Sequence, residues 1–321
     1  MMADHQSSEE SPELWSLQRQ IQELKTRMGI VKSDIMTTYE KPPFKAHPND
    51  VFVAAPAKNG TTWLVHICHQ IRMQGQEPDF EDQLHVIAWI ETSEKLYGVD
   101  PATQQQPAKP RVFMTHLPYP VVPKEGKRIF CLRNQKDALI SAYHFFNSVM
   151  SLKGRISLSV FAHAYVQEIK NTLNDLLLWW EHRHDDNLLL LFFDDLKDDH
   201  VGCVHQIAKF IGVDCDEDVI ARVVHTTSHA EMARCSSKFN ATGRKIALRV
   251  AEKTGDTLTP ESEFSGRVRK SGGKSGEGKQ LLPIEIQQLV DQLWQEIISA
   301  KLGFQSLEEM RQAWKKEQLR G

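Results

Sequence analysis

The sequence predicts an α/β fold in which a parallel β-sheet is flanked by helices on both faces. Short apolar, β-branched runs alternate with long stretches of helical periodicity, and this alternation is typical of parallel sheets. With 321 residues, of which 40% are hydrophobic and 25% charged, the chain can bury a sizeable core beneath a soluble surface. The expected strands are residues 51–55, 111–115, 128–132 and 188–193.

We expect a helical extension over residues 1–40 and a single domain over residues 41–321. Residues 11–28 carry apolar side chains at helical spacing, which could pack on the domain, line a cleft or pair with another chain. Residues 238–263 are polar with few apolar anchors, and we expect them to form a mobile lid. We find no apolar run of about 18 residues that could span a membrane and no signal-sequence core in the first 13 residues.

The first expected strand ends at Pro56 and leads into the turn formed by residues 58–62. Trp63 then opens an apolar pattern of helical period. A glycine-containing turn between a strand and a helix directs backbone N–H groups and the helix dipole at an anion. Lys58 adds a cation and Trp63 a flat surface for a base, so we expect a phosphate-bearing ligand. An ordinary strand-to-helix turn with a surface lysine is the simpler alternative.

This turn is not a standard P-loop. A standard P-loop places its lysine after the second glycine and follows it with a Ser or Thr that holds Mg²⁺. Here Lys58 precedes Gly60. A nucleotide kinase on a related fold would need the standard loop and a metal-binding carboxylate, so the sequence argues against that function.

Two later segments supply further anion-binding groups. Arg133 follows the strand expected at 128–132, and Ser141 lies about one turn into the next helix, so both could hold one phosphate. Residues 267–279 contain five cations and four glycines, and such a backbone can approach an anion closely. Taken alone, the second segment could equally be a solvated basic loop.

In order and spacing, these segments resemble the cytosolic sulfotransferase family from about residue 50 to residue 279. Residues 58–63 are similar to the family's Lys-Ser-Gly-Thr-Thr-Trp loop, and residues 133–137 to its Arg-Asn-Pro-Lys-Asp segment. Residues 114–118 are similar to its Lys-Thr-His-Leu-Pro motif. Arg269 and the residues after it are similar to its Arg-Lys-Gly loop. The resemblance implies a P-loop-NTPase-like sheet and sulfuryl transfer from 3′-phosphoadenosine 5′-phosphosulfate (PAPS), which leaves adenosine 3′,5′-bisphosphate (PAP).

The resemblance also implies roles for individual residues. His116 would be the general base, which suits an imidazole because it titrates near neutral pH, and Lys58 would neutralise the bridging oxygen. Nucleotide contacts would come from Lys58, Asn59, Gly60, Thr61, Thr62, Trp63, Arg133, Ser141, Phe193, Thr227, Arg269, Lys270, Ser271 and Gly272. Candidate walls of the acceptor site, with core packing as the alternative for each, are Trp89, Met114, Tyr119, Phe145 and Phe146. No metal is required.

The chain departs from the family pattern at several positions. Met114 replaces a lysine, Phe193 replaces a tyrosine, and the glycine-rich loop is two residues longer with Gly278 where tryptophan is typical. These departures indicate a distant branch. They leave open a non-catalytic PAP-binding homologue as the alternative to an enzyme.

Composition narrows the partners and the compartment that we expect. The net charge of −3 gives no general case for nucleic acid. Five cysteines without a Cys-x-x-Cys pair suggest reduced thiols and a cytoplasmic location. His66 and His69 have no clear ligand partners nearby and are expected to pack or face solvent instead of binding a metal. The expected partner is a small-molecule acceptor. Residues 279–283 lack the dimer-contact pattern of the family, so the resemblance leaves both a monomer and a homodimer open.

Overall fold

The computed structural model describes residues 16–319 except 153, 259–265, 267 and 270–273. At its centre lies a five-stranded sheet in the order β2-β3-β1-β4-β5. Every neighbouring pair of strands is parallel. The predicted fold class is therefore confirmed, and the two-residue strand β2 is an addition that the mixed pattern around it did not reveal. The strands are β1 Val51–Ala54, β2 Ala88–Trp89, β3 Val112–Thr115, β4 Lys127–Leu132 and β5 Leu188–Phe192.

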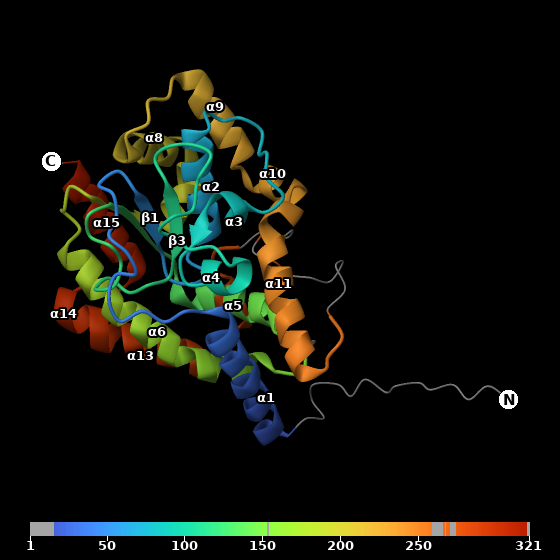
Figure 1. Cartoon of the computed structure of the whole chain (residues 1–321). Coiled ribbons are helices and arrows are strands. Elements are labelled where there is room, and N and C mark those ends of the chain that lie inside the picture. The colour runs from blue at the N-terminus through green and yellow to red at the C-terminus, as the bar shows by residue number, and fades with distance from the viewer. Residues whose placement is uncertain (1–15, 153, 259–265, 267, 270–273, 320–321) are drawn as a thin grey trace.

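Helices cover both faces of this sheet (Figure 1). On one face α2 packs against β1, β3, α8 and α9, and on the other α5 packs against α6 and α12. The helices of the described residues are α1 Leu17–Ile30, η2 Val31–Ile35, α2 Thr61–Arg72, α3 Gln83–Val86, α4 Ser93–Tyr97, α5 Gln135–Val149, α6 Leu158–Glu181, α7 Phe193–Asp198, α8 His200–Ile211, α9 Glu217–Thr226, α10 His229–Arg234, α11 Ser237–Thr254, α12 Glu277–Leu281, α13 Ile284–Trp294, η4 Gln295–Ser299, α14 Ala300–Leu302 and α15 Leu307–Gln318. None of them is long and apolar enough to cross a membrane.

The register of the sheet gathers three loops at one edge. Strand β1 is buried along its whole length, as expected for a parallel strand covered on both faces. It pairs with β3 from Val51↔Val112 to Ala54↔Thr115 and with β4 on its other side. The loops that follow β1, β3 and β4 therefore leave the same edge, where α/β folds commonly bind ligands.

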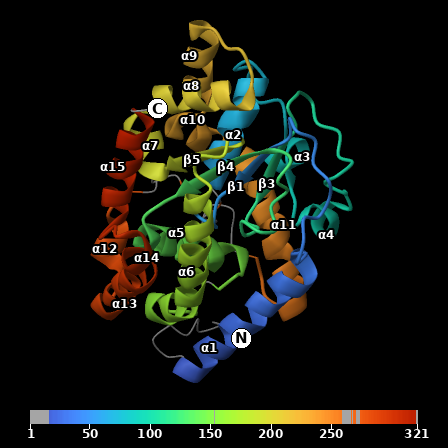
Figure 2. The same ribbon diagram turned by 90° about the vertical axis from the view of Figure 1, so that its left-hand side faces the viewer.

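The N-terminal helix α1 packs on the domain, against α6 and α11 (Figure 2). Arg27 of α1 is 1% exposed and donates a hydrogen bond of 2.6 Å to the carbonyl oxygen of Met150. It also forms ion pairs with Glu23 and Asp256. Of the three roles considered for the apolar stripe, packing is supported for Leu24, which is buried, whereas Leu17 and Ile21 of the same stripe are exposed.

The lid predicted at residues 238–263 is wrong for its larger part. Residues 237–254 form the long helix α11, which packs on α3, α5 and α1. Its few apolar side chains are enough because Phe239, Ile246 and Val250 lie on one face and are all buried. Residues 259–263 of the predicted lid lie outside the described part of the chain.

Candidate functional site

The loop between β1 and α2 has the backbone of an anion-binding turn. Lys58 has φ 66° and Gly60 has φ 95°, both in the left-handed region. A Cβ atom on Gly60 would lie 2.8 Å from a ring carbon of Phe193, so this position requires glycine. No side chain caps the N-terminus of α2. The Thr61 hydroxyl is buried and has no hydrogen-bond partner among the described residues.

Asn59 joins this loop to the start of α5. Its side-chain oxygen accepts hydrogen bonds from the backbone N–H of Arg133 at 2.8 Å and from Gln135 Nε2 at 3.1 Å. Its Nδ2 donates to the carbonyl oxygen of Ala57 at 3.0 Å. The predicted nucleotide contact at Asn59 thus has its amide engaged within the protein, where it positions Lys58 and Arg133. Gln135 was not singled out from the sequence.

Arg133 is a buried cation with unused donors. It is 4% exposed, and within the described part of the chain its Nε and Nη2 have no hydrogen-bond partner. Its guanidinium carbon lies 4.6 Å from the centre of the Phe193 ring. Burial lowers the Arg133 pKa and the charge of Asp137 opposes that effect. A guanidinium remains charged at neutral pH, so its free N–H groups fit an anion. Together with Thr61, they suit a ligand that carries two anionic groups.

The base of the glycine-rich loop is anchored to α5. The carboxylate of Asp137 accepts hydrogen bonds from the backbone N–H groups of Gly276 at 2.9 Å and Gly278 at 2.7 Å. A Cβ on Gly278 would lie 2.4 Å from the carbonyl carbon of Lys136, which explains why no larger side chain occupies this position. Arg269 pairs with Glu277 at 2.6 Å. The predicted contacts Lys270, Ser271 and Gly272 lie outside the described residues.

Three predicted nucleotide contacts come together beside the loop after β1. The Trp63 Nε1–H donates to the carbonyl oxygen of Thr227 at 2.8 Å, and the Trp63 ring stands edge-on to Phe193 with centroids 5.8 Å apart. His200, which the sequence did not indicate, lies 5.2 Å from the Trp63 ring and 3.1 Å from the Thr227 hydroxyl. The rings of Trp63 and Phe193 lie next to Arg133, whose guanidinium contacts the Phe193 ring. Ser141, another predicted contact, is half-buried on α5.

His116 follows β3 and is held by contacts on both its ring and its backbone. Its Nδ1 lies 2.7 Å from the carbonyl oxygen of Ala55. Its backbone N–H donates to Glu91 Oε1 at 2.5 Å. Glu91 is 3% exposed, and burial raises its pKa to about 7 against the opposing effect of hydrogen bonds. Sequence reasoning missed Glu91, although an acid directly after the apolar residues 87–90 was a usable signal.

The predicted acceptor wall divides into two groups. Trp89 stands edge-on to His116 with ring centroids 5.4 Å apart, and Phe145 lies under the Lys58 Nζ at 4.1 Å from its ring centre. Met114 is buried in β3 in register with Trp89.

The other two candidates pack against α6. Tyr119 contacts the rings of Trp179 and His182, with centroids 4.9 Å and 4.7 Å away. Phe146 contacts Phe161 at 5.9 Å. Tyr119 is buried in the core. Phe146 is half-buried and also contacts Phe145, with ring centroids 5.5 Å apart, so its place in the acceptor wall stays a prediction.

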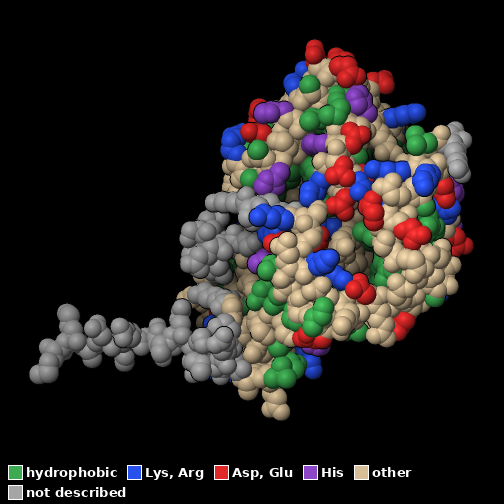
Figure 3. Space-filling model, turned by 180° about the vertical axis from the view of Figure 1, so that it is seen from behind, with side chains coloured by type: hydrophobic (Ala, Val, Ile, Leu, Met, Phe, Trp, Pro, Cys, Tyr) green, Lys and Arg blue, Asp and Glu red, His purple; other side chains and the backbone are tan. Residues whose placement is uncertain are grey.

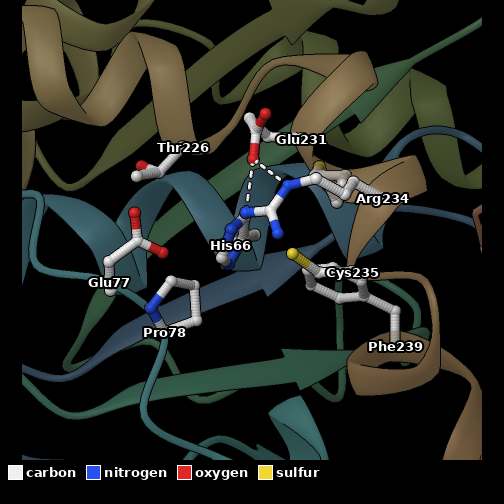
Figure 4. A pocket seen from close by; sticks show the side chains of 9 residues that line it. His66, Glu77, Pro78, Thr226, Glu231, Arg234, Cys235 and Phe239 are labelled. Atoms are coloured by element: carbon white, nitrogen blue, oxygen red, sulfur yellow. Dashed lines mark hydrogen bonds and ion pairs between the residues drawn. The ribbon is translucent and has the colours of Figure 1, made fainter.

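A separate small cavity lies beside His66 (Figure 4). Its volume of about 10 Å³ is that of roughly one water molecule, so it cannot hold an acceptor. Figure 4 shows the Glu231–Arg234 ion pair above His66, with an Nε–Oε2 distance of 2.7 Å. His66 and His69 are both buried, and burial lowers the His66 pKa to about 4. Both histidines therefore pack in the interior, and the alternative expectation that they face solvent is wrong.

The described residues show neither a clustered metal site nor a broad basic face in the view of Figure 3. No group of three or more His, Cys, Asp or Glu side chains gathers there as a metal site would. On the face shown in Figure 3, basic and acidic side chains are interspersed and do not form one broad basic area. Lys58 is half-buried and Arg133 is buried, so neither cation belongs to a broad basic surface.

Comparison with known proteins identifies the family. The family model for the sulfotransferase domain matches residues 48–299. The chain belongs to the sulfotransferase domain family. Amine sulfotransferase from Oryctolagus cuniculus is 29% identical over 199 residues, which cover 59% of this chain and 64% of that protein. Sulfotransferase 1E1 from Homo sapiens is 30% identical over 201 residues, which cover 59% and 68%. The match thus spans about two thirds of these relatives' length.

Solved structures share the fold of this sulfotransferase-domain chain. Retinol dehydratase in a complex with retinol and PAP superposes with a TM-score of 0.62 and 19% identity, over 86% of each chain. Mouse sulfotransferase SULT7A1 complexed with PAP superposes with a TM-score of 0.57 and 22% identity, over 80% of this chain and 86% of that one. At these identities the likeness concerns the fold alone.

Proposed function

We propose that this protein transfers a sulfuryl group from PAPS to a hydroxyl or amine of a small-molecule acceptor and releases PAP. The observation that carries the proposal is a pair of buried donors, on Thr61 and Arg133 after neighbouring strands, that have no hydrogen-bond partner among the described residues. A buried donor without a partner is costly, and a bound anion removes that cost. Membership of the sulfotransferase domain family supports the same reaction.

The two donors would divide the phosphates of the nucleotide between them. Thr61, Thr62 and the uncapped N-terminus of α2 would hold the 5′-phosphosulfate, because helix N-termini favour anions. Arg133, with Ser141 and Arg269, would hold the 3′-phosphate and so discriminate against ATP, which lacks it. The rings of Trp63 and Phe193 would contact the base.

His116 is suited to be the general base because of the contact that its ring makes. The carbonyl oxygen of Ala55 can only accept a hydrogen bond, so Nδ1 carries the proton. The neutral ring then has its lone pair on Nε2, which can take a proton from the acceptor. A positioned base of this kind contributes about 10²–10⁴-fold to the rate.

Lys58 would neutralise the leaving group. The acceptor oxygen or nitrogen bonds to sulfur as His116 removes its proton, while the bond between sulfur and the bridging oxygen breaks. The charge that develops on the bridging oxygen needs a cation, as in phosphoryl transfer. The left-handed backbone of Lys58 and the Phe145 ring beneath its Nζ support this assignment, since such backbone conformations concentrate at functional sites.

The acceptor site would lie between Trp89 and Phe145, which flank His116 and Lys58. Two aromatic rings favour an acceptor with an apolar body and one reactive hydroxyl or amine. The relative named amine sulfotransferase, and the neighbour solved with retinol, agree with that class.

A thermal-shift titration with PAP, ADP and ATP, without added metal, tests the nucleotide site first. A ligand present at 100 times its Kd raises the free energy of unfolding by about 2.7 kcal/mol, so selective stabilisation by PAP is expected. An equal response to ATP, or none to PAP, would remove the basis for the proposal.

Variants then separate an enzyme from a PAP-binding homologue without activity. His116→Ala should abolish turnover of PAPS and keep the PAP response, whereas Lys58→Ala should damage both. His163→Ala, an exposed histidine on α6, is the matched control and should behave as the wild type. Full turnover in His116→Ala would eliminate the assignment of the base.

A further inference from the structure

A buried carboxyl group lies directly behind the proposed base. Glu91 follows β2, and His116 follows β3, which is the neighbouring strand. The Ile90 backbone N–H donates to the carbonyl oxygen of Met114 at 3.0 Å, so the two segments stay paired up to Glu91. Glu91 Oε1 then accepts the hydrogen bond from the backbone N–H of His116 at 2.5 Å.

This contact completes the fixation of His116. The ring is held by the carbonyl oxygen of Ala55, and the backbone is held by Glu91. Glu91 is held in turn, because its own carbonyl oxygen accepts the backbone N–H of Thr37 at 2.7 Å. A backbone carbonyl would be enough to accept the hydrogen bond from His116 if its role were only structural. An ionisable carboxyl group at this position therefore points to a second role.

The neighbours of the Glu91 carboxyl group come from three elements. The side chains of Thr115 and Trp89 face the carboxyl group from β3 and β2. Tyr39 faces it from the segment after η2; burial raises the Tyr39 pKa most, and the charges of Glu94 and Glu91 add to that effect. Among these neighbours, His116 is the group that can become a cation.

We propose that Glu91 is a positioning residue whose ionised carboxylate stabilises the protonated imidazole of His116. The inference rests on the proposed function for its purpose, because His116 becomes a cation when it removes the acceptor's proton. A nearby carboxylate favours the charged form of an imidazole, and here the carboxylate lies against the backbone nitrogen of the same residue. Glu91 and His116 then titrate as a coupled pair.

NMR titration of the His116 ring tests this without any acceptor. We expect the ring signals of the wild-type protein, labelled at histidine and assigned with His116→Ala, to titrate in two steps. In Glu91→Gln, an amide oxygen still accepts the His116 N–H but the charge is gone. There we expect a single step whose pKa is lower by about one unit. An identical titration in both proteins would overturn the inference.

Asp175→Asn is the matched control. Asp175 is also a largely buried carboxylate that accepts a backbone N–H from the same loop, that of Tyr119 at 2.7 Å. Its amide variant should leave the His116 titration unchanged, and an equal change in both variants would also overturn the proposal. The carboxyl signal of Glu91 gives a reciprocal measurement that does not need the Glu91 variant to fold. We expect it to titrate in two steps in the wild-type protein and in one step in His116→Gln.

The outcome for Glu91 is distinguishable from the outcome for the proposed function. A coupled titration in a protein that does not respond to PAP would support the Glu91–His116 pair and reject the transfer reaction. A PAP response with an uncoupled titration would reject only the role of Glu91.

Discussion

Replacing Glu91 with glutamine should make the folded protein more stable at alkaline pH. Burial raises the Glu91 pKa from 4.5 to about 7. Below pH 4.5 the group is protonated in both the folded and the unfolded chain, so it has no effect. Between the two values only the unfolded chain ionises, and stability falls as the pH rises. Above about pH 7 the group is ionised in both states, and the free energy of unfolding stays lower by about 3 kcal/mol, at about 1.4 kcal/mol per pKa unit.

Urea unfolding at two pH values isolates this contribution. Between about pH 5 and pH 8, the free energy of unfolding of the wild-type protein should fall by about 2.5 kcal/mol more than that of Glu91→Gln. Titrating groups that do not interact with Glu91 cancel in the comparison because both proteins contain them, and the NMR titration of His116 measures the one coupling that does not cancel. Glu81→Gln, at a solvent-exposed glutamate ten residues earlier, is the control and should follow the wild type. Equal pH dependences in the wild type and Glu91→Gln would refute the reasoning, since they would mean that the buried carboxyl ionises without cost.

Three further predictions follow from buried polar groups and close contacts. Thr61→Val should leave the unfolding midpoint of the free protein unchanged or higher and reduce PAP affinity about tenfold, measured by calorimetry, because the hydroxyl has no partner within the described chain. Gly278→Ala should destabilise the protein by about 1–3 kcal/mol in urea and weaken PAP binding, because the added methyl meets the Lys136 backbone at 2.4 Å; Gly29→Ala, which meets nothing within 4 Å, should not. His66→Gln should remove a loss of about 2 kcal/mol between pH 7 and pH 5, because burial lowers the His66 pKa to about 4 and only the unfolded chain is protonated in that range; an unchanged acid sensitivity in urea titrations would contradict this.

Local patterns in the sequence were sufficient for the strands and for the anion-binding turn. The runs at 51–55, 111–115, 128–132 and 188–193 correspond to β1, β3, β4 and β5 within one residue at each end. Strand formation there depends on neighbouring apolar side chains, and the turn depends on the backbone of Lys58 and Gly60. Both are properties of short segments, so they can be read before the chain is folded.

The partners of these segments depended on the order of the strands. Asn59 contacts Arg133 across 74 residues, Glu91 contacts His116 across 25, and Asp137 contacts Gly276 across 139. Hydrophobic periodicity carries no information about which strands become neighbours. The order β2-β3-β1-β4-β5 places Asn59 beside Arg133 and Glu91 beside His116, and the packing of α12 on α5 places Gly276 beside Asp137.

The sequence by itself therefore determined the fold class, and it predicted the turn after β1 as an anion site and the histidine after β3 as a base. The tertiary structure alone decided that the Asn59 side chain bonds to the backbone of Arg133, that Tyr119 packs on α6 and that residues 237–254 form a packed helix. It also decided that a buried acid stands behind the proposed base. The physical reason is that burial and electrostatic environment are set by residues distant in the chain, whereas backbone conformation is set largely by adjacent ones.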